Sequence, residues 1–470
     1  MISQEVPCIQ KLAPISLKIT VVGGGLSGLA SAYALQRAGH HVTVLEKSDG
    51  KARSLGGIRS SPNMTKVLIK WGFQRELLEI ATKHESTLLF DAETGEKLGM
   101  MSGKLNDQIR KDSDPHSAFY LITHSDTYNL LFDAVTREGV NIRFNAKVVD
   151  ADSHAGLVLL ENGEQINADL IVGADGCHST LRCHVESLEE KMLRKADNIV
   201  ILSFAGAIDV DDVKGDLRLL EQESDRHLCF GDGFYASVYS YAEQQGKRKY
   251  SVLLVHRYEP NLVPAEYEDW SSFDTSPDFN FNLGKLSPWL RKLIDSSTQT
   301  WGRIFSIKPT LQCLDKERIV LVGEAVHTLS PSSFLSSAMA FEDAHTLGCL
   351  FSAIEDRSQI YRFLAAYDEI RLPRASFASY KDAIHQRAAT LPPGPHRIMR
   401  DKFLPKSIAE EEEREVEMEQ LYMEEIKMYA YDPALETVAW WSQYGPMVLK
   451  SVTEQKVLEV TVAEEIVAIS

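Results

Sequence analysis

The sequence of 470 residues contains no run of about 20 uninterrupted apolar residues, so we expect no membrane-spanning helix. Its N-terminal stretch, MISQEVPCIQKLAPIS, has no apolar core of the kind that marks a secretory signal peptide. Positive charge is also scarce, because 50 Lys and Arg residues stand against 67 Asp and Glu residues, for a formal net charge of −17. A nucleic-acid partner is therefore not expected, since phosphate backbones attract surfaces rich in Lys and Arg.

Paired cysteines are absent as well. None of the 6 cysteines lies in a CxxC pair, which argues against a structural zinc site and against a disulfide framework. We therefore expect no metal site, free thiols and a reducing, cytoplasmic environment. Apolar residues make up 44% and charged residues 25% of the chain, as in an ordinary globular protein that can bury a large core.

The sequence does contain a strand–turn–helix–strand pattern near its start. Residues 17–22 (LKITVV) predict a short buried strand, residues 27–38 predict a helix, and residues 41–47 predict a second strand. Two more buried strands are predicted at residues 168–174 and 318–323. One α/β domain assembled from distant segments is the simplest explanation of these four strands.

Between the third and fourth of these strands the pattern changes. Alternating stretches such as FYASVYSY and KYSVLLVHRY predict antiparallel strands, and the end of the chain predicts mainly helices. We therefore predict a nucleotide-binding domain in two parts, residues 1–188 and 305–390. A β-rich substrate domain, residues 189–304, is inserted between them, and residues 391–470 form C-terminal helices.

The turn after the first strand carries the motif Gly23-x-Gly25-x-x-Gly28, and Glu46 ends the second strand. Glycines permit a tight turn and let the backbone approach a pyrophosphate, which the N-terminus of the following helix attracts. An acid at the position of Glu46 can accept hydrogen bonds from both hydroxyls of an adenosine ribose. With a strand before it, a helix after it and an acid at this distance, the motif predicts a dinucleotide site.

Two later motifs resemble those of a known enzyme family. They are ADLIVGADGCHSTLR at residues 168–182 and GEAVHTLSPSSFLSSAMAFEDA at residues 323–344. Together with the glycine motif and the loop Gly56-Gly57-Ile58, they resemble the class A flavin monooxygenases, which include salicylate and p-hydroxybenzoate hydroxylases. The resemblance implies an α/β fold with a Rossmann-type, glutathione-reductase-like FAD-binding domain, an interleaved β-rich substrate domain and a helical C-terminus.

The resemblance also implies a reaction. FAD would be the cofactor, NADPH or NADH a transient reductant, and O2 the second substrate. The organic substrate would be a small electron-rich aromatic, enol or alkene, hydroxylated or epoxidised, and the similarity to fungal members points to a secondary-metabolite intermediate. The residues implied to contact FAD are Gly23, Gly25, Gly28, Glu46, Gly57, His124, Asp175, Gly323, Glu324, Pro331 and Ser336. His327 is implied to be a structural member of the flavin loop.

Three positions depart from the family pattern. Glu324 replaces an Asp, His124 replaces an Arg, and Ser336 replaces a Gly in a loop that reads Phe334-Leu335-Ser336 here. These departures favour one alternative, a non-redox cyclase or isomerase on the same fold with lost or structural FAD. A plain NAD-dependent dehydrogenase is disfavoured, because it would need neither later motif. Tyr239 is the candidate to line the substrate site, although a core or interface tyrosine fits its position equally well.

Overall fold

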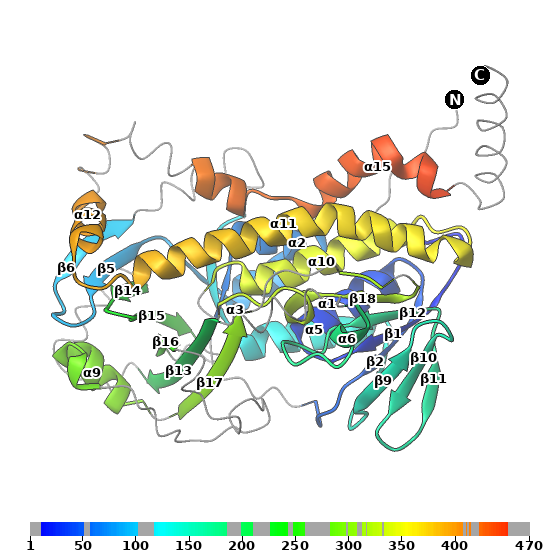
Figure 1. The fold of residues 1–470 in the computed structure, drawn as a ribbon, viewed down its shortest axis with the longest axis horizontal. Coiled ribbons are helices and arrows are strands. Elements are labelled where there is room, and N and C mark those ends of the chain that lie inside the picture. Colours follow the sequence, from blue (N-terminus) through cyan, green and yellow to red (C-terminus); the bar gives the residue numbers. More distant parts are fainter. Residues whose placement is uncertain are drawn as a thin grey trace, which may run out of the picture.

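The fold consists of two large sheets covered by long helices (Figure 1). The computed structural model describes residues 11–50, 57–101, 117–185, 199–209, 226–242, 248–258, 283–297, 299–307, 313–315, 317–330, 333–407, 410, 413–414 and 423–449. Among the helices described, none is both long enough and apolar enough to cross a membrane.

The first large sheet is parallel and has the order β18-β12-β1-β2-β8. Its strands are β1 (Lys18–Val22), β2 (His41–Leu45), β8 (Asn141–Arg143), β12 (Leu170–Gly173) and β18 (Ile319–Leu321). Consecutive residues of β1, β12 and β18 are buried, so both faces of this part of the sheet are covered. The prediction that strands from distant segments form one α/β unit is confirmed.

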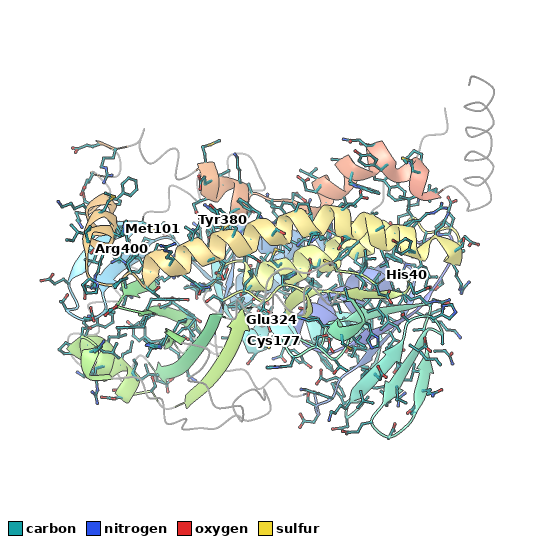
Figure 2. The ribbon with its side chains drawn as sticks, in the orientation of Figure 1. His40, Met101, Cys177, Glu324, Tyr380 and Arg400 are labelled. Carbon is teal, nitrogen blue, oxygen red and sulfur yellow. The ribbon has the colours of Figure 1, made fainter. Side chains whose placement is uncertain are left out.

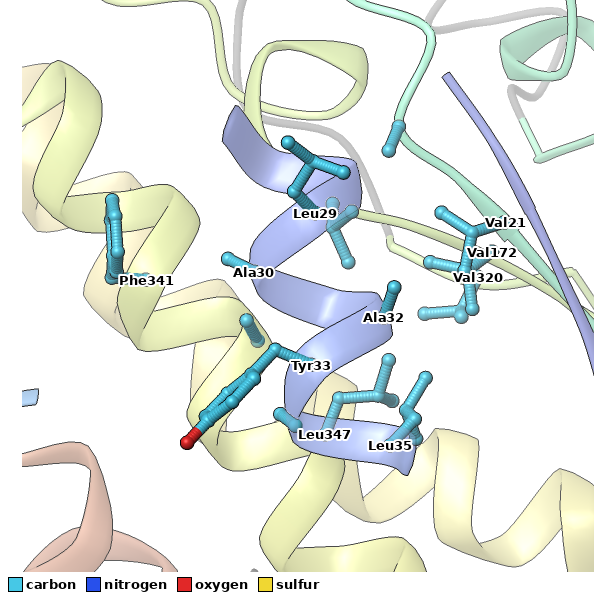
Figure 3. Close-up of a cluster of buried hydrophobic side chains, with 14 of the residues drawn as sticks. Val21, Leu29, Ala30, Ala32, Tyr33, Leu35, Val172, Val320, Phe341 and Leu347 are labelled. Atoms are coloured by element: carbon cyan, nitrogen blue, oxygen red, sulfur yellow. The ribbon is translucent and has the colours of Figure 1, made fainter. Parts of the chain in front are cut away.

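Helix α1 (Leu26–Arg37) lies between this sheet and helix α10 (Ser336–Phe351) (Figure 3). Ala30 faces Phe341 of α10, whereas Ala32 faces Val172 and Val320 of the sheet (Figure 3). Small side chains on both faces let the helix approach its two neighbours closely. The packing thereby joins the first and third sequence motifs into one rigid unit.

The second large sheet has the order β17-β13-β16-β15-β14-β5-β6. Its strands are β5 (Thr87–Asp91), β6 (Lys97–Met101), β13 (Ile199–Asp209), β14 (Arg226–Phe230), β15 (Phe234–Ala242), β16 (Arg248–Tyr258) and β17 (Gln299–Ile307). All neighbouring strands are antiparallel except β14 and β5, which are parallel. The predicted insert 189–304 supplies most of this sheet, while β5 and β6 come from the preceding segment.

The two faces of β15 have different partners. Phe234, Ala236 and Val238 belong to an apolar cluster with helix α9 (Pro288–Asp295). Tyr235, Tyr239 and Tyr241 alternate with them along the strand, so they lie on the opposite face. Tyr239 packs there against Gly57 of β3 (Gly57–Ser60), which directs this tyrosine face toward the nucleotide-binding part.

Two small sheets and several helices complete the fold. The sheets have the orders β11-β10-β9 and β3-β7-β4. Their strands, besides β3, are β4 (Thr82–Lys83), β7 (Tyr120–Thr123), β9 (Val148–Asp152), β10 (Leu157–Leu160) and β11 (Gln165–Asn167). The other helices of the first half are α2 (Pro62–Lys70), α3 (Gln74–Ile80), α5 (His124–Arg137) and α6 (Arg182–Val185).

The C-terminal part is helical, as predicted. Helix α11 (Ile360–Ala389) extends along the molecule past both large sheets (Figure 1), and α12 (Pro395–Phe403) and α15 (Pro433–Leu449) follow. Trp441 of α15 packs on Phe363 of α11, with ring centroids 5.8 Å apart. The acidic run at residues 410–425 lies mostly outside the described residues.

Two buried histidines give the fold a predictable sensitivity to acid. His345 accepts a hydrogen bond at Nδ1 from the indole N–H of Trp71 at 3.0 Å, and His40 accepts one at Nδ1 from the N–H of Leu17 at 3.2 Å. Both bonds require an unprotonated Nδ1. Burial lowers the pKa of each histidine to about 4. The unfolded chain, with an ordinary histidine pKa of about 6.5, therefore binds protons first as the pH falls.

We expect the free energy of unfolding to decrease as the pH drops from 6.5 toward 4. Linkage gives a loss of about 2 kcal/mol per histidine by pH 5, because the unfolded rings take up protons that the folded rings do not. Denaturant unfolding at pH 7 and pH 5 tests this for the wild type, His345→Gln and a control, His154→Gln, whose side chain is 91% exposed. A His345→Gln variant with unchanged pH dependence would contradict the prediction.

Candidate functional site

Three turns meet at one edge of the parallel sheet. Strands β1, β12 and β18 are adjacent and parallel, so the turns that follow them lie side by side at their carboxyl ends. A Cβ atom on Gly23 would lie 2.3 Å from the backbone oxygen of Ala174, and one on Gly323 would lie 2.0 Å from Oγ of Ser27. The structure thus brings the three sequence motifs together, and their close approach requires glycine at both positions.

The glycine turn has one closed side and one open side. A Cβ atom on Gly28 would lie 1.9 Å from the backbone oxygen of Gly23, so α1 can approach the turn only with glycine there. At Gly25 a Cβ atom would meet no described atom within 4 Å. Within the described chain, no side chain caps the first turn of α1, whose N–H groups remain able to bind an anion. The open side at Gly25 therefore fits the pyrophosphate of a dinucleotide.

Glu46, at the end of the second strand, forms a hydrogen bond with the glycine turn. Its Oε2 accepts a hydrogen bond from the N–H of Gly24 at 2.6 Å, and its Oε1 accepts one from the N–H of Ser48 at 2.8 Å. Each carboxylate oxygen can accept more than one hydrogen bond, so both retain the capacity to accept from ribose hydroxyls. The half-buried position of Glu46 beside the turn fits the expected ribose contact.

Asp175 orders the second turn. Its Oδ2 accepts hydrogen bonds from the N–H groups of Thr180 at 2.7 Å and Leu181 at 3.3 Å, and burial raises the pKa of its carboxyl group. The buried Arg182 then links this motif to the third. Its Nε donates to the backbone oxygen of Ala325 at 2.7 Å and its Nη2 to that of Glu324 at 2.9 Å. The two later motifs are therefore one hydrogen-bonded unit.

The buried carboxylate of Asp343 stabilises the third turn by accepting a hydrogen bond from its backbone. Asp343 Oδ2 accepts from the N–H of Gly323 at 2.9 Å and lies 2.6 Å from Nε2 of His327, while Oδ1 accepts from Nε of Arg371 at 2.8 Å. Although burial opposes ionisation, His327 and Arg371 hold the pKa of Asp343 well below its usual range. His327, implied by the family resemblance to be structural, is 2% exposed and faces this carboxylate.

The neighbouring acid forms a second part of the same network. Glu342 accepts a hydrogen bond from Nδ2 of Asn63 at 2.5 Å and two from Arg374, at 2.9 and 3.1 Å. Arg371 lies 2.9 Å from the same carboxylate. Sequence reasoning missed both arginines. Their spacing of three residues predicts a shared helix face, but nothing in the sequence indicates which acids that face meets.

Three of the predicted positions gather beside β3. A Cβ atom on Gly57 would lie 2.2 Å from the hydroxyl oxygen of Tyr239, which is buried there. Burial raises the pKa of Tyr239. His124 is the half-buried first residue of α5 and follows Thr123, whose strand position pairs with Gly57. These residues lie where the tyrosine face of the second sheet meets the nucleotide-binding part.

The remaining predicted positions belong to the third motif. Glu324 lies in the short turn Gly323–Ala325, at the centre of the molecule in the view of Figure 2. Ser336 begins α10, and its Oγ donates to the backbone oxygen of Ser333 at 3.2 Å. Pro331 lies outside the described residues.

A protein-family model described as an FAD binding domain matches residues 16–265 of this chain. Two similar curated proteins are hispidin-3-hydroxylase from Neonothopanus nambi and the FAD-dependent monooxygenase cfoG from Aspergillus candidus. The first is 28% identical, over 77% of this chain and 87% of its own length, and the second is 27% identical, over 77% and 83%. The relatives found in this way carry the names of monooxygenases and hydroxylases, so the non-redox alternative finds no support in them.

Solved structures share the fold. Klebsiella pneumoniae HpxO, crystallised with FAD and uric acid, superposes with a TM-score of 0.66 at 20% sequence identity. The match covers 89% of this chain and 97% of that one. Because the glycine turn, the open side at Gly25 and the fold agree, FAD is a cofactor that the residues present can accommodate.

Proposed function

This chain belongs to the FAD binding domain family of FAD-dependent monooxygenases, and we propose that it uses NADPH or NADH together with O2 to hydroxylate or epoxidise an electron-rich small molecule. The substrate would be an aromatic, enol or alkene compound. One observation carries the proposal: the turns of the three motifs meet at the carboxyl ends of β1, β12 and β18, and Tyr235 on the second sheet contacts Ser330 of the third motif.

Several of the described residues would hold the cofactor. The N-terminus of α1 would bind the pyrophosphate beside Gly25, and Glu46 would accept hydrogen bonds from the ribose. Asp343 fixes the N–H of Gly323 and with it the start of the loop that reaches α10. When bound, FAD supplies a hydride acceptor and the means of activating O2.

The second sheet would provide the substrate side of the site. Tyr235 lies with its hydroxyl 3.1 Å from Oγ of Ser330 in the third motif, and Tyr239 lies against Gly57. These buried contacts bring a sheet face and the third-motif loop together, and they would exclude water from the region between them. We therefore assign Tyr239 to the boundary between cofactor and substrate, where it would orient the substrate.

The names of the relatives support a substrate class for this proposal. Both of the curated relatives described above come from fungi, and they are named as a 3-hydroxylase of hispidin and as an FAD-dependent monooxygenase. A fungal secondary-metabolite intermediate with an electron-rich ring or double bond is the corresponding proposal for this chain, and it rests on this analogy.

An absorbance spectrum tests the proposed reaction. Purified protein is mixed with FAD, and NADPH or NADH is added in air, with and without a panel of hydroxyaromatic and enol compounds. We expect flavin bands that bleach with one of the nucleotides and return with oxygen, faster in the presence of a compound that binds. A chain that takes up no flavin, or whose bound flavin neither nucleotide reduces under any of these conditions, would contradict the proposal.

A further inference from the structure

Helix α12 has its charged face toward the rest of the molecule and its apolar face toward solvent. The side chains of Arg397 and Arg400 are each 11% exposed. By contrast, Ile398, Met399 and Phe403 are 55%, 72% and 41% exposed, and no residue of this helix is buried. A surface helix normally packs its apolar face against the core, so the orientation of α12 is the reverse of the usual one.

Polar contacts fix α12 in this orientation. Arg397 forms ion pairs with Asp91 at the end of β5 and, at 3.2 Å, with Glu93 in the turn that follows. The Nη1 atom of Arg400 donates to the backbone oxygen of Ala388 near the end of α11 at 2.7 Å. The apolar side chains of α12 therefore cannot turn inward without breaking these contacts.

Positive charge accompanies the apolar side chains. Lys402 lies on the same helix face as Ile398, Met399 and Phe403, because residues four apart are neighbours on a helix. In residues 383–407, all of which the structure describes, the exposed Lys and Arg side chains are Arg387, Lys402 and Lys406, and no Asp or Glu side chain is exposed. This local charge is opposite in sign to the net charge of −17 of the whole chain.

The apolar surface continues onto β6. Met101, at the end of this strand, is 36% exposed. The N–H of Met100 donates to the backbone oxygen of Pro405 at 2.8 Å, so the end of β6 lies beside the chain that leaves α12. Figure 2 shows Met101 and Arg400 close together at the end of the molecule that α12 occupies. A group of exposed apolar side chains of this kind marks an interaction surface.

We propose that this surface, made of the outward face of α12 with Met101, Arg387 and Lys406, docks on a lipid bilayer that carries anionic headgroups. The apolar side chains would enter the boundary between headgroups and acyl chains, with α12 parallel to the bilayer, and the exposed cations would contact lipid phosphates. The acidic remainder of the chain is repelled by such a bilayer, so the attraction must come from this face. The proposal is independent of the reaction proposed above.

Vesicle binding tests the proposal. The FAD-loaded full chain is sedimented with vesicles of phosphatidylcholine alone and with vesicles of phosphatidylcholine mixed with phosphatidylserine, at low and at physiological salt. We expect at least about tenfold tighter binding to the anionic vesicles, and a loss of that preference as salt screens the charges. Equal binding to the two kinds of vesicle, or binding to neither, would overturn the proposal.

An apolar variant tests whether α12 is the face that docks. The triple variant Ile398→Gln, Met399→Gln, Phe403→Gln should bind anionic vesicles at least about tenfold more weakly, because it removes the side chains that enter the bilayer. The matched control, Leu78→Gln with Val149→Gln, changes side chains that are 46% and 37% exposed on α3 and β9. This control should bind vesicles as the wild type does. Undiminished binding by the triple variant would refute the assignment.

A charge variant tests the headgroup contacts. Arg387→Gln with Lys402→Gln should weaken binding to anionic vesicles about tenfold or more, since each cation near the surface contributes about fivefold, and should leave binding to neutral vesicles unchanged. All variants should bind FAD as the wild type does, because these residues lie outside the candidate cofactor site, and thermal melting verifies that they are folded. An unchanged preference for anionic vesicles in this double variant would refute the role of these cations.

Sedimentation velocity separates the bilayer from a second copy of the chain. If the wild type self-associates and binds neither kind of vesicle, while the triple variant is a monomer, the α12 face joins two copies and the bilayer is refuted. If the wild type binds anionic vesicles as a monomer and both α12 variants lose that binding, the proposal stands, whether or not a nicotinamide nucleotide reduces the flavin.

Discussion

Gly25→Val should leave the fold intact and abolish retention of FAD, whereas Gly28→Ala, three residues later, should destabilise the nucleotide-binding part itself. At Gly25 an added Cβ atom meets no described atom within 4 Å, and its φ of −74° suits any residue. A branched side chain there would occupy the space that fits a pyrophosphate. We expect the dissociation constant for FAD to rise at least about 100-fold, since the phosphate contacts to the backbone are lost.

The Gly28 variant has a different defect. A Cβ atom at this position would lie 1.9 Å from the backbone oxygen of Gly23, and neither backbone segment can move without separating α1 from β1. We expect a loss of about 3 kcal/mol or more in the free energy of unfolding. Flavin fluorescence titration and thermal melting of both variants check the pair. A Gly25→Val protein as yellow as the wild type, or a Gly28→Ala protein as stable as the wild type, would contradict the assignment of the turn.

The strands and turns of the nucleotide-binding part could be predicted from the sequence because their signals are local. The apolar run at residues 17–22 and the glycines after it correspond to β1 and the start of α1, with bounds that differ by one residue. The strand prediction at residues 318–323 succeeded for the same reason. A buried strand needs a continuous apolar run, and a turn that meets a helix at close range needs glycine; both are visible without knowing the partners.

Partners far away in the sequence could not be predicted. Strands β5 and β6 join the second sheet through parallel pairing of β5 with β14, although a run of alternating residues says nothing about which strand it will meet. The same limit applies to Arg59 and Arg226. Each stands alone in the sequence, and only the structure shows that strands β3 and β14 bring both side chains to the ring of Phe334.

The loop that contains Ser336, one of the departures from the family pattern, makes contacts that the sequence does not reveal. Phe334 lies two residues before Ser336 in the same loop, and its backbone oxygen accepts a hydrogen bond from Ser61 at 3.1 Å while its ring contacts two arginines. The loop therefore contacts the start of α2 through its backbone, and strands β3 and β14 through the side chain of Phe334.

Arg371→Met should cost about 3–5 kcal/mol of the free energy of unfolding, because it leaves two buried carboxylates short of a cation. Arg371 donates to Asp343 at 2.8 Å and lies 2.9 Å from Glu342, and all three side chains are at most 1% exposed. Since Asp343 also accepts the N–H of Gly323, the third turn should loosen and FAD affinity should fall along with stability. Denaturant unfolding and flavin titration measure the two effects.

The matched control is an arginine that makes an equally short ion pair on the solvent-exposed surface. Arg143 donates from Nη1 and Nη2 to the two carboxylate oxygens of Glu164, each at 2.7 Å, and the two side chains are 35% and 42% exposed. Because exposed ion pairs contribute little, Arg143→Met should leave stability and FAD affinity unchanged. Arg371→Lys restores the charge but not the planar fork that reaches both acids, and it should recover only part of the loss. If Arg371→Met unfolds at the same denaturant concentration as Arg143→Met, the buried network does not stabilise the third turn, and the position of Gly323 must be set by the packing of α1 against α10 alone.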